Sequence, residues 1–376
     1  MYIPQQHLKN LFNLLQPQKA VIIYGPRRCG KTTLINHMCE QIDAKYLLVN
    51  GEDVTIQEYL SSQSIEKLRS FVGDVKFLII DEAQKIKNIR LNIKLLLDNI
   101  KDLQIVATGS SSFDLARYIG EPLTGRKYTL KMFPLSQLEI NNIQTRAETD
   151  AKLEERLIYG SYPEVILAKS DSERVTYLKE LISSYLYKDI LEIEGIRHSD
   201  KLIRLLQLLA FQIGKEVSFN EFGQQLGMSK NTVDKYFDLL EKTFVISKLK
   251  GFSRNLRKEV SKNSRYYFYD LGIRNALINN FNLLSVRNDI GMLWENYIVM
   301  ERIKKQEYLN IVSNNYFWRT YDQKEIDFIE EREGKLYGYE IKWSGGKHKP
   351  PKQWFNTYKG SEFTVITKDN YLDFIS

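Results

Sequence analysis

The sequence has little of what disulfide-stabilised, zinc-binding or membrane-spanning proteins depend on. Its 376 residues include two cysteines, Cys29 and Cys39, too few for a disulfide framework, and four histidines, none at zinc-ligand spacing with a cysteine. No apolar run approaches the ~20 residues that a membrane helix needs, and the start lacks a basic-then-apolar signal sequence. These absences predict a protein of the reducing cytoplasm without a membrane partner.

The charge balance is modestly basic, and its placement is more informative than its size. Lys and Arg number 54 against 47 Asp and Glu, a formal net charge of +7. Residues 248–265 alone hold seven basic side chains against one acid, Glu259. Because a concentrated positive segment suits a phosphate backbone, nucleic acid is a candidate partner.

Three zones of different pattern follow one another along the chain, as expected for two or three domains at this length. The first, to about residue 140, alternates helical patterns with short apolar runs at 20–24, 46–49, 76–80 and 104–108. Continuous apolar runs of this length predict buried parallel strands, so the fold class is α/β. The second zone is rich in helical patterns. The third, from about residue 285, contains all four tryptophans and returns to strand-like alternation.

A phosphate-binding loop follows the first apolar run. The residues that match its G-x-x-x-x-G-K-[ST] pattern are Gly25, Pro26, Arg27, Arg28, Cys29, Gly30, Lys31, Thr32 and Thr33. The glycines let backbone N–H groups and a helix N-terminus face phosphate oxygens. Lys31 supplies charge for the β- and γ-phosphates, and the Thr32 hydroxyl is a magnesium ligand. We therefore expect ATP and Mg²⁺ as cofactors.

A second motif completes the expected nucleotide site. The apolar run at 76–80 delivers Asp81 to the carboxyl end of a strand, where its carboxylate can hold the magnesium shell, and Glu82 is placed to polarise an attacking water. An Asp-Glu pair by itself can also serve only to cap a helix. In combination with the phosphate-binding loop, the pair indicates nucleotide hydrolysis.

Two further positions have open interpretations. The strand at 104–108 ends in a polar turn, where Thr108, or as second choice Ser110, can orient the water; a plain serine-rich cap is an equally good explanation. Arg126 follows a glycine turn before a strand. It either stabilises γ-phosphate charge in a neighbouring subunit or is an ordinary surface residue.

The order of these motifs resembles prokaryotic AAA-type ATPases whose C-terminal half is a domain of unknown function. The matching stretches are the loop at 25–33, Asp-Glu-Ala-Gln at 81–84, Thr-Gly-Ser-Ser at 108–111, Leu-Thr-Gly-Arg at 123–126, Lys-Met-Phe-Pro-Leu-Ser at 131–136, Tyr-Gly-Ser-Tyr-Pro-Glu at 159–164 and Tyr-Leu-Tyr-Lys-Asp-Ile at 185–190. The resemblance spans essentially the whole chain. Ser161 departs from it, because a second glycine is usual there.

The middle zone resembles a winged helix. Helical patterns at 201–213 and 219–226 precede a turn and a third helix capped by Ser229, and strand patterns at 244–249 and 265–269 flank the basic segment. The side chains expected to contact nucleic acid are Lys230, Asn231, Lys235, Arg254, Arg257, Lys258 and Lys262. Acidic residues on the third helix argue against deep groove insertion, and such a fold can instead dock a protein.

The C-terminal zone resembles restriction-endonuclease-like folds. In the strand pattern at 338–343, Glu340 and Lys342 share one face, and Asp327 stands in the preceding strand pattern at 324–329. With the helical Glu295, these residues match a D…E-x-K arrangement in which carboxylates hold Mg²⁺ and the lysine positions water. The alternatives are a charged hairpin face in solvent, or an inactive relative of such a nuclease.

The expected organisation is an AAA-type ATPase domain at 1–140, a helical lid or linker at 141–195, a winged helix at 196–284 and a restriction-endonuclease-like domain at 285–376. The leading functional hypothesis is an oligomeric ATPase that acts with nucleic acid. The rivals are a nucleotide-dependent switch that docks a protein partner, and a metal-dependent nuclease gated by ATP.

Overall fold

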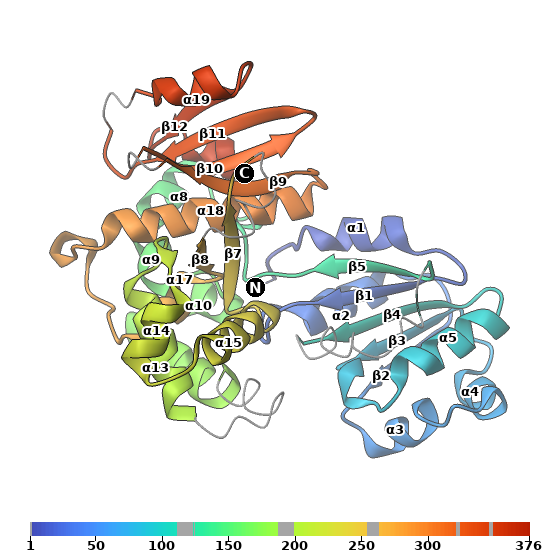
Figure 1. The fold of residues 1–376 in the computed structure, drawn as a ribbon. Helices are drawn as coiled ribbons and strands as arrows, with labels where there is room; N and C mark the ends of the chain where they lie inside the picture. Colours follow the sequence, from blue (N-terminus) through green and yellow to red (C-terminus); the bar gives the residue numbers. More distant parts are fainter. Residues whose placement is uncertain are drawn as a thin grey trace. The chain divides into compact units, whose positions relative to one another are not determined.

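The computed structural model describes residues 2–110, 123, 125–186, 199–253, 263–320, 324–345 and 349–376, without the side chains of 185, 186 and 199 (Figure 1). Two compact units make up the chain. The smaller comprises Tyr2–Pro134 and Lys242–Phe244, and the larger comprises Leu135–Glu241 and Val245–Ser376. The boundaries expected near 195 and 285 fall inside the larger unit, and the four-part division stays a prediction.

The smaller unit is built on a parallel sheet of five strands. These are β1 (Ala20–Tyr24), β2 (Tyr46–Asn50), β3 (Phe77–Asp81), β4 (Gln104–Gly109) and β5 (Lys127–Lys131), in the order β2-β3-β4-β1-β5. The four apolar runs singled out in the sequence are all strands, with ends within one residue of those expected. The predicted α/β class with a parallel sheet is confirmed.

Helices cover both faces of this sheet, which explains the unbroken apolar runs. Alternate strand residues such as Val21 and Ile23 pack with α1 (His7–Leu14) and α2 (Lys31–Gln41). Their neighbours Ala20 and Ile22 pack on the other face. That face is covered by α3 (Val54–Leu60), α4 (Ile65–Val72) and α5 (Ile89–Asn99). The carboxyl ends of β1, β3 and β4 therefore meet at one rim, as nucleotide binding requires.

The larger unit begins with short helices. They are α7 (Gln137–Ile140), α8 (Arg146–Ala151), α9 (Leu153–Tyr159), α10 (Pro163–Leu167), α11 (Asp171–Leu181) and the π-helical turn Ile182–Leu186. The following helices are α13 (Ser199–Phe211), α14 (Phe219–Leu226), α15 (Lys230–Lys242), α17 (Leu271–Leu277), α18 (Ile290–Tyr308), α19 (Lys352–Thr357) and α20 (Tyr371–Ile375). The Ser229 hydroxyl accepts a hydrogen bond of 3.1 Å from the Thr232 amide, so the expected cap of α15 forms.

A single seven-stranded sheet runs through the larger unit. Its strands are β6 (Glu216–Val217), β7 (Ile246–Gly251), β8 (Ser264–Phe268), β9 (Asn314–Arg319), β10 (Glu325–Arg332), β11 (Lys335–Ile341) and β12 (Glu362–Ile366), in the order β12-β11-β10-β9-β7-β8-β6. Strand β7 joins the two halves, because residues 246–249 pair with β8 and residues 250–251 pair with β9. The strands expected for the winged helix and those expected for the nuclease-like region are thus hydrogen-bonded neighbours.

Several strand ends in the larger unit differ from the sequence expectation. Strand β7 begins at Ile246 rather than at 244, and β11 ends at Ile341, so that Lys342 and Trp343 follow the strand instead of belonging to it. In β10, the register with β9 shifts between Ile326 and Ile329. This bulge breaks the simple alternation around Asp327, so that residues 326–329 are all buried.

The stretch at 159–164 has a structural explanation. The Asp270 carboxylate accepts hydrogen bonds from the Ser161 amide at 2.7 Å and the Gly272 amide at 2.8 Å. A Cβ at Gly160, where φ is +75°, would lie 2.1 Å from Asp270 Oδ1, and one at Gly272 would lie 2.0 Å from the Tyr159 carbonyl oxygen. The two backbones can approach only because glycine stands at both positions. The stretch therefore joins α9 to α17.

In the described part of the chain, no helix combines the length and the apolar character needed to cross a membrane.

Candidate nucleotide site and carboxylate cluster

The loop at 25–33 joins β1 to α2 in a conformation that its glycines permit. Gly30 has a φ of +96°, and a Cβ there would lie 2.6 Å from Gln5 Nε2; a Cβ at Gly25 would lie 2.4 Å from the Met132 carbonyl oxygen. Gln5 Nε2 donates a hydrogen bond of 3.2 Å to the Gly30 carbonyl. The loop is thus held from both sides by backbone and amide contacts that leave no room for larger residues.

The Lys31 side chain lies inside this loop. It is buried, and its Nζ donates hydrogen bonds to the carbonyl oxygens of Gly25 at 3.1 Å and Pro26 at 2.8 Å. Its ammonium group is therefore held at the N-terminus of α2, where backbone N–H groups and the helix dipole also favour an anion. Arg27, Arg28 and Thr33 lie at least partly exposed along the same loop, whereas Cys29 is buried in the core with Leu34. The thiol therefore does not face a ligand in the loop.

Asp81, at the end of β3, joins residues of α2 and β4. Its Oδ2 accepts a hydrogen bond of 2.7 Å from the Thr32 hydroxyl, and its Oδ1 accepts one from the Thr108 hydroxyl. The Glu82 amide donates to Asp81 Oδ1 at 3.2 Å and to Thr108 Oγ1 at 3.1 Å. Because β4 lies between β1 and β3, Thr108 stands between the two motifs, and Ser110, also buried, follows the end of β4. The Thr108 hydroxyl positions Asp81 and the backbone of Glu82.

Glu82 sits in a turn that its neighbours shape. Its φ is +50°, and its Oε2 accepts a hydrogen bond from Gln84 Nε2. The Gly51 amide donates to the Asp81 carbonyl at 2.8 Å, and a Cβ at Gly51 would lie 2.5 Å from the Glu82 carbonyl oxygen. Sequence reasoning missed Gln5, Gly51 and Gln84 as supporting residues. Gln84 belongs to the quoted Asp-Glu-Ala-Gln stretch, but the other two carry no local signal.

Arg126 has a partner within its own unit. Its Nη2 lies 2.9 Å from Asp98 Oδ1, with the two side chains 37% and 35% exposed. A role for Arg126 in a neighbouring subunit would require this ion pair to break, which costs little because both side chains are partly exposed to water.

The donor set at the rim suits a magnesium ion. Mg²⁺ prefers oxygen ligands and keeps several waters, so a hydroxyl and a carboxylate beside phosphate oxygens suffice. The Thr32 hydroxyl and Asp81 Oδ2 are 2.7 Å apart and stand next to the phosphate-binding loop.

A second polar cluster assembles in the larger unit. Lys342 Nζ lies 2.7 Å from Glu340 Oε1 and 3.5 Å from Asp327 Oδ2, and the Ile341 amide donates to Asp327 Oδ2 at 2.9 Å. The three residues of the D…E-x-K pattern are thus brought together. The bulge in β10 turns Asp327, which is 3% exposed, into the interior.

Four more side chains join this cluster. Glu295 of α18 accepts a hydrogen bond of 2.7 Å from the Tyr267 hydroxyl, and Arg265 Nη1 lies 3.5 Å from Glu295 Oε1 and 3.7 Å from Asp327 Oδ1. Arg265 Nη2 lies 2.7 Å from Glu325 Oε2. Burial raises the pKa of the Glu295 carboxyl to about 8, and the nearby Asp327 charge acts in the same direction. The sequence pattern predicted Glu295 but not Arg265, Tyr267 or Glu325.

The expected nucleic-acid contacts are only partly described. Lys230, Asn231 and Lys235 are exposed on α15, as is Lys250 at the end of β7. The expected wing residues Arg254, Arg257, Lys258 and Lys262 lie outside the described residues. Arg265, counted above with the basic segment, is buried among carboxylates and does not contribute to an exposed basic surface.

Three family models match successive parts of the chain. Residues 17–141 match a model described as an AAA domain, which contains the phosphate-binding loop, Asp81 and Glu82. Residues 150–284 and 290–369 match two models described as domains of unknown function, DUF8612 and DUF4143. The smaller unit therefore carries an AAA-type P-loop domain, and the remainder of the chain consists of regions whose families have no assigned function.

Curated relatives that align with three quarters or more of the chain are uncharacterized proteins. A protein of Mycobacterium tuberculosis is 25% identical over 331 residues, which cover 86% of this chain and 70% of that protein. One of Haemophilus influenzae is 25% identical over 389 residues, covering 98% of this chain and 91% of its own. A protein of Methanocaldococcus jannaschii is 25% identical over 340 residues, which cover 85% of this chain and 74% of that protein. Relatives that align with most of this chain thus occur in both bacteria and archaea.

Solved structures resemble the chain only distantly. A STAND-type signal transduction ATPase of Pyrococcus horikoshii shares 14% identity, with a TM-score of 0.29 over 81% of this chain and 46% of that chain. The ORC1 protein of Aeropyrum pernix, solved in complex with DNA, shares 13% identity, with a TM-score of 0.28 over 73% of this chain and 91% of its own. Similarity at this level supports no conclusion about activity or partner.

Proposed function

We propose that this protein binds and hydrolyses Mg-ATP and uses the cycle to change its conformation. The observation that carries the proposal is the hydrogen-bonded set at one sheet rim: Thr32 Oγ1 bonds Asp81 Oδ2 at 2.7 Å, and the Glu82 amide bonds Asp81 Oδ1 at 3.2 Å. A plain nucleotide-binding turn needs no acidic residue beyond the one that holds the metal. Glu82, fixed beside Asp81, adds the group that hydrolysis requires.

Each residue has a role in this mechanism. The loop amides and Lys31 bind the β- and γ-phosphates and offset their charge. A magnesium ion held by Thr32 and Asp81 would neutralise charge between the phosphates. Glu82 orients the attacking water and accepts its proton. The side-chain amide of Gln84 donates a hydrogen bond to Glu82 Oε2 and so holds that carboxylate in one rotamer. The Thr108 hydroxyl holds the Asp81 carboxylate and the Glu82 backbone in place through hydrogen bonds.

The decisive experiment separates binding from turnover. Lys31→Ala should abolish binding of a fluorescent ATP analogue, whereas Glu82→Gln should bind ATP normally and lose turnover. The matched controls are Lys67→Ala on α4 and Glu58→Gln on α3, both exposed positions of the same unit. Wild-type turnover in Glu82→Gln would refute the role assigned to Glu82.

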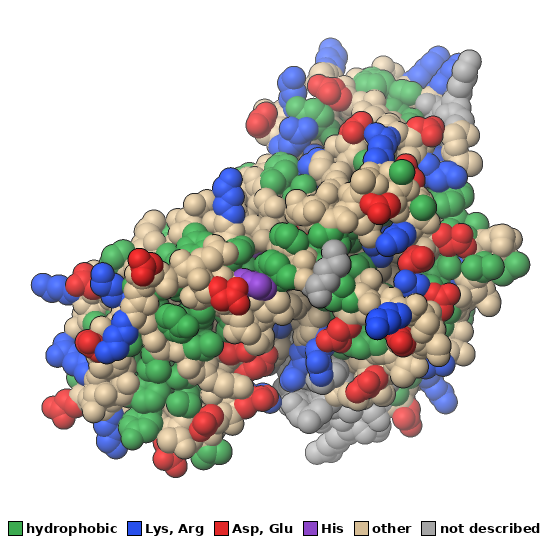
Figure 2. All heavy atoms as spheres, turned by 180° about the vertical axis from the view of Figure 1, so that it is seen from behind, with side chains coloured by type: hydrophobic (Ala, Val, Ile, Leu, Met, Phe, Trp, Pro, Cys, Tyr) green, Lys and Arg blue, Asp and Glu red, His purple; other side chains and the backbone are tan. Residues whose placement is uncertain are grey.

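We infer that nucleic acid is the leading partner. Support comes from the order of elements at 199–268, helix, strand, two helices and two strands, which matches a winged helix, and from the exposed lysines Lys230, Lys235 and Lys250. Figure 2 shows basic and acidic side chains interspersed over one face of the molecule. The net positive charge is thus not spread as one basic surface on that face, and a local contact at residues 248–262 remains the expectation.

Salt dependence distinguishes this partner from a protein. Neutralising Arg254, Arg257 and Lys258 should weaken DNA binding and reduce its dependence on salt, because fewer counterions are released. The control neutralises three exposed lysines of the smaller unit, Lys67, Lys87 and Lys94. Unchanged DNA affinity in the first variant would contradict the wing contact and favour the alternative, a nucleotide switch that docks a protein. The ATPase rate per subunit can also be measured as the protein concentration rises. An increase in the wild type that is lost in Arg126→Ala would support an oligomer in which this arginine acts on a neighbouring subunit.

A further inference from the structure

The D…E-x-K pattern implies a magnesium ion beside Asp327, and the cluster can be tested for its fit to one. Asp327 Oδ2 accepts a hydrogen bond from the Ile341 amide at 2.9 Å and lies 3.5 Å from Lys342 Nζ, while Oδ1 lies 3.7 Å from Arg265 Nη1. Both oxygens of the central carboxylate therefore face donors of the protein itself.

The two other expected ligands are engaged in the same way. Glu340 Oε1 lies 2.7 Å from Lys342 Nζ. Glu295 Oε1 accepts a hydrogen bond from the Tyr267 hydroxyl at 2.7 Å and lies 3.5 Å from Arg265 Nη1. Within the described ranges, no three carboxylate, imidazole or thiol side chains are arranged to hold a metal ion. The residues present do not fit the ion that their pattern implies.

Arg265 accounts for this misfit. Its side chain is 6% exposed, its guanidinium carbon lies 4.7 Å from the centre of the Phe317 ring, and its three carboxylate neighbours come from two elements, α18 and β10. Its Nε is buried and has no hydrogen-bond partner among the residues that the structure describes. A guanidinium leaves water only when carboxylates compensate its charge, so this position depends on the acidic cluster.

A divalent ion and this guanidinium would compete for one place. Because the repulsion between two charges is proportional to their product, a divalent ion would be repelled by the guanidinium about twice as strongly as a singly charged ion. Lys342 adds a second positive charge 3.5 Å from Asp327. Arg265 comes from β8, which is separated from β10 in the sheet by β7 and β9. Its ion pairs therefore also link β8 to β10 and α18 across the two strands that separate β8 from β10.

We infer that Arg265 is the resident cation of this carboxylate site: its guanidinium takes the place of the divalent ion, and the C-terminal region neither holds Mg²⁺ there nor uses it to cleave nucleic acid. The inference is independent of the proposed ATPase, whose site lies in the other unit. It decides against the ATP-gated nuclease among the hypotheses raised by the sequence.

Titration with Mn²⁺, followed by electron paramagnetic resonance, tests the inference directly. The full-length chain carrying Asp81→Asn, which removes the metal ligand of the nucleotide site, should bind no Mn²⁺ in the absence of ATP. One bound Mn²⁺ that disappears when Asp327→Asn is added would overturn the inference. DNA cleavage that depends on Mg²⁺ and on Asp327 would overturn it as well.

Removing the guanidinium supplies the complementary test. In the same background, Arg265→Gln should gain one Mn²⁺ site, and Asp327→Asn should abolish the gain. Arg265→Lys keeps the positive charge and should bind no Mn²⁺. Circular dichroism establishes whether each variant is folded. If folded Arg265→Gln gains no Mn²⁺ site, Arg265 does not stand in for an ion; if this variant does not fold, the titration of the Asp81→Asn protein decides.

Discussion

The hydroxyl of Thr32 donates a hydrogen bond of 2.7 Å to Asp81 Oδ2, across 49 positions of sequence and two different motifs. Thr32 belongs to the start of α2 and Asp81 to the end of β3. The contact shows that the two nucleotide motifs form one site in the folded chain. Its components can be perturbed one at a time.

The first prediction concerns this hydrogen bond. Thr32→Val keeps the shape of the side chain but removes the hydroxyl, so Asp81 Oδ2 loses its partner and the expected magnesium loses a ligand. Leaving a polar group unpaired costs about 1–3 kcal/mol, and if this cost falls on the transition state we expect the ATPase rate to fall roughly 5- to 150-fold. Thr32→Ser should retain most of the rate. Steady-state ATPase assays over a range of magnesium concentrations measure the effect, and Thr55→Val, at an exposed position of α3, is the control. A wild-type rate in Thr32→Val would contradict the assignment.

The second prediction concerns Gly51, a residue that belongs to neither of the two nucleotide motifs in the sequence. A Cβ at this position would lie 2.5 Å from the Glu82 carbonyl oxygen and 3.2 Å from that of Asp81. Gly51→Ala should displace this backbone and lower ATPase turnover, while nucleotide binding by the loop at 25–33 persists. Gly291→Ala on α18 serves as the control, because an added Cβ there meets nothing within 4 Å among the described residues beyond its chain neighbours and the nearby backbone of its own helix. Equal turnover in the two variants would show that the turn at Glu82 tolerates displacement.

The third prediction is a pH dependence of stability from His7. The His7 Nε2–H donates to the Lys131 carbonyl at 2.9 Å, and burial lowers the pKa of the imidazole to about 4. The unfolded chain, with a pKa near 6.5, therefore binds more protons than the folded chain between about pH 4 and 6.5. The stabilisation is complete above about pH 6.5 and is lost as the pH falls toward 4, by up to about 3 kcal/mol.

His7→Gln tests this dependence, because it does not titrate but keeps a donor for the Lys131 carbonyl. Urea unfolding followed by circular dichroism from about pH 7.5 to about pH 4.5 should show a shallower decline in the variant than in the wild type. Parallel declines would place the acid sensitivity elsewhere.

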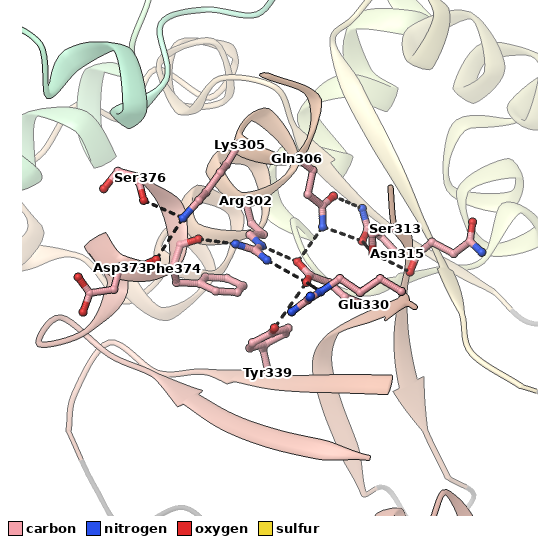
Figure 3. A network of polar contacts seen from close by, with 12 residues as sticks. Arg302, Lys305, Gln306, Ser313, Asn315, Glu330, Tyr339, Asp373, Phe374 and Ser376 are labelled. Atoms are coloured by element: carbon pink, nitrogen blue, oxygen red, sulfur yellow. Dashed lines mark hydrogen bonds and ion pairs between the residues drawn. The ribbon is translucent and has the colours of Figure 1, made fainter. Parts of the chain in front are cut away.

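The fourth prediction concerns a buried ion pair in the larger unit. Figure 3 shows Arg302 of α18 facing Glu330 of β10, with Gln306 and Tyr339 around the same carboxylate. Arg302 Nη2 lies 2.9 Å from Glu330 Oε2, Gln306 Nε2 donates to Oε1 at 2.7 Å, and the Glu330 side chain is fully buried. Removing one partner should destabilise this unit by about 3–5 kcal/mol, because the other charge is left buried.

A double-mutant cycle measures the pair. Arg302→Met and Glu330→Gln should each lower the free energy of unfolding, and the double variant should lose less than the sum of the two. Tryptophan fluorescence reports this unit selectively, since all four tryptophans, at 294, 318, 343 and 354, belong to it. Additive losses would mean that the two side chains do not stabilise each other.

Much of the smaller unit was predictable because its signals are local. Apolar runs such as residues 20–24 form buried strands whatever their neighbours, and the pattern at 25–33 needs its glycines for reasons internal to the loop. The packing of Gln5 on Gly30 was not predictable. These residues are distant in sequence, and neither belongs to a periodic pattern shared with the other.

The fold of the larger unit was harder to predict from the sequence, because it depends on pairing between segments that are distant in the chain. The helix at 219–226 was predicted with its observed ends, but strand β7 pairs with β8 through one half and with β9 through the other. Periodicity shows that a segment is extended and does not show which strand it pairs with. The exchange of partners along one strand therefore left no trace in the sequence pattern.

The sequence by itself determined the parallel sheet, the phosphate-binding loop with Lys31, and the acidic pair at 81–82, because each depends on residues close together in the chain. The tertiary structure decided what the side chains of distant segments do to one another. Asp327, Glu340 and Lys342 have the spacing of a metal site, yet Arg265 on β8 also lies beside the Asp327 carboxylate. A charge that belongs in sequence to a basic surface segment became the internal partner of an acidic cluster, because burial allows a guanidinium only where carboxylates surround it.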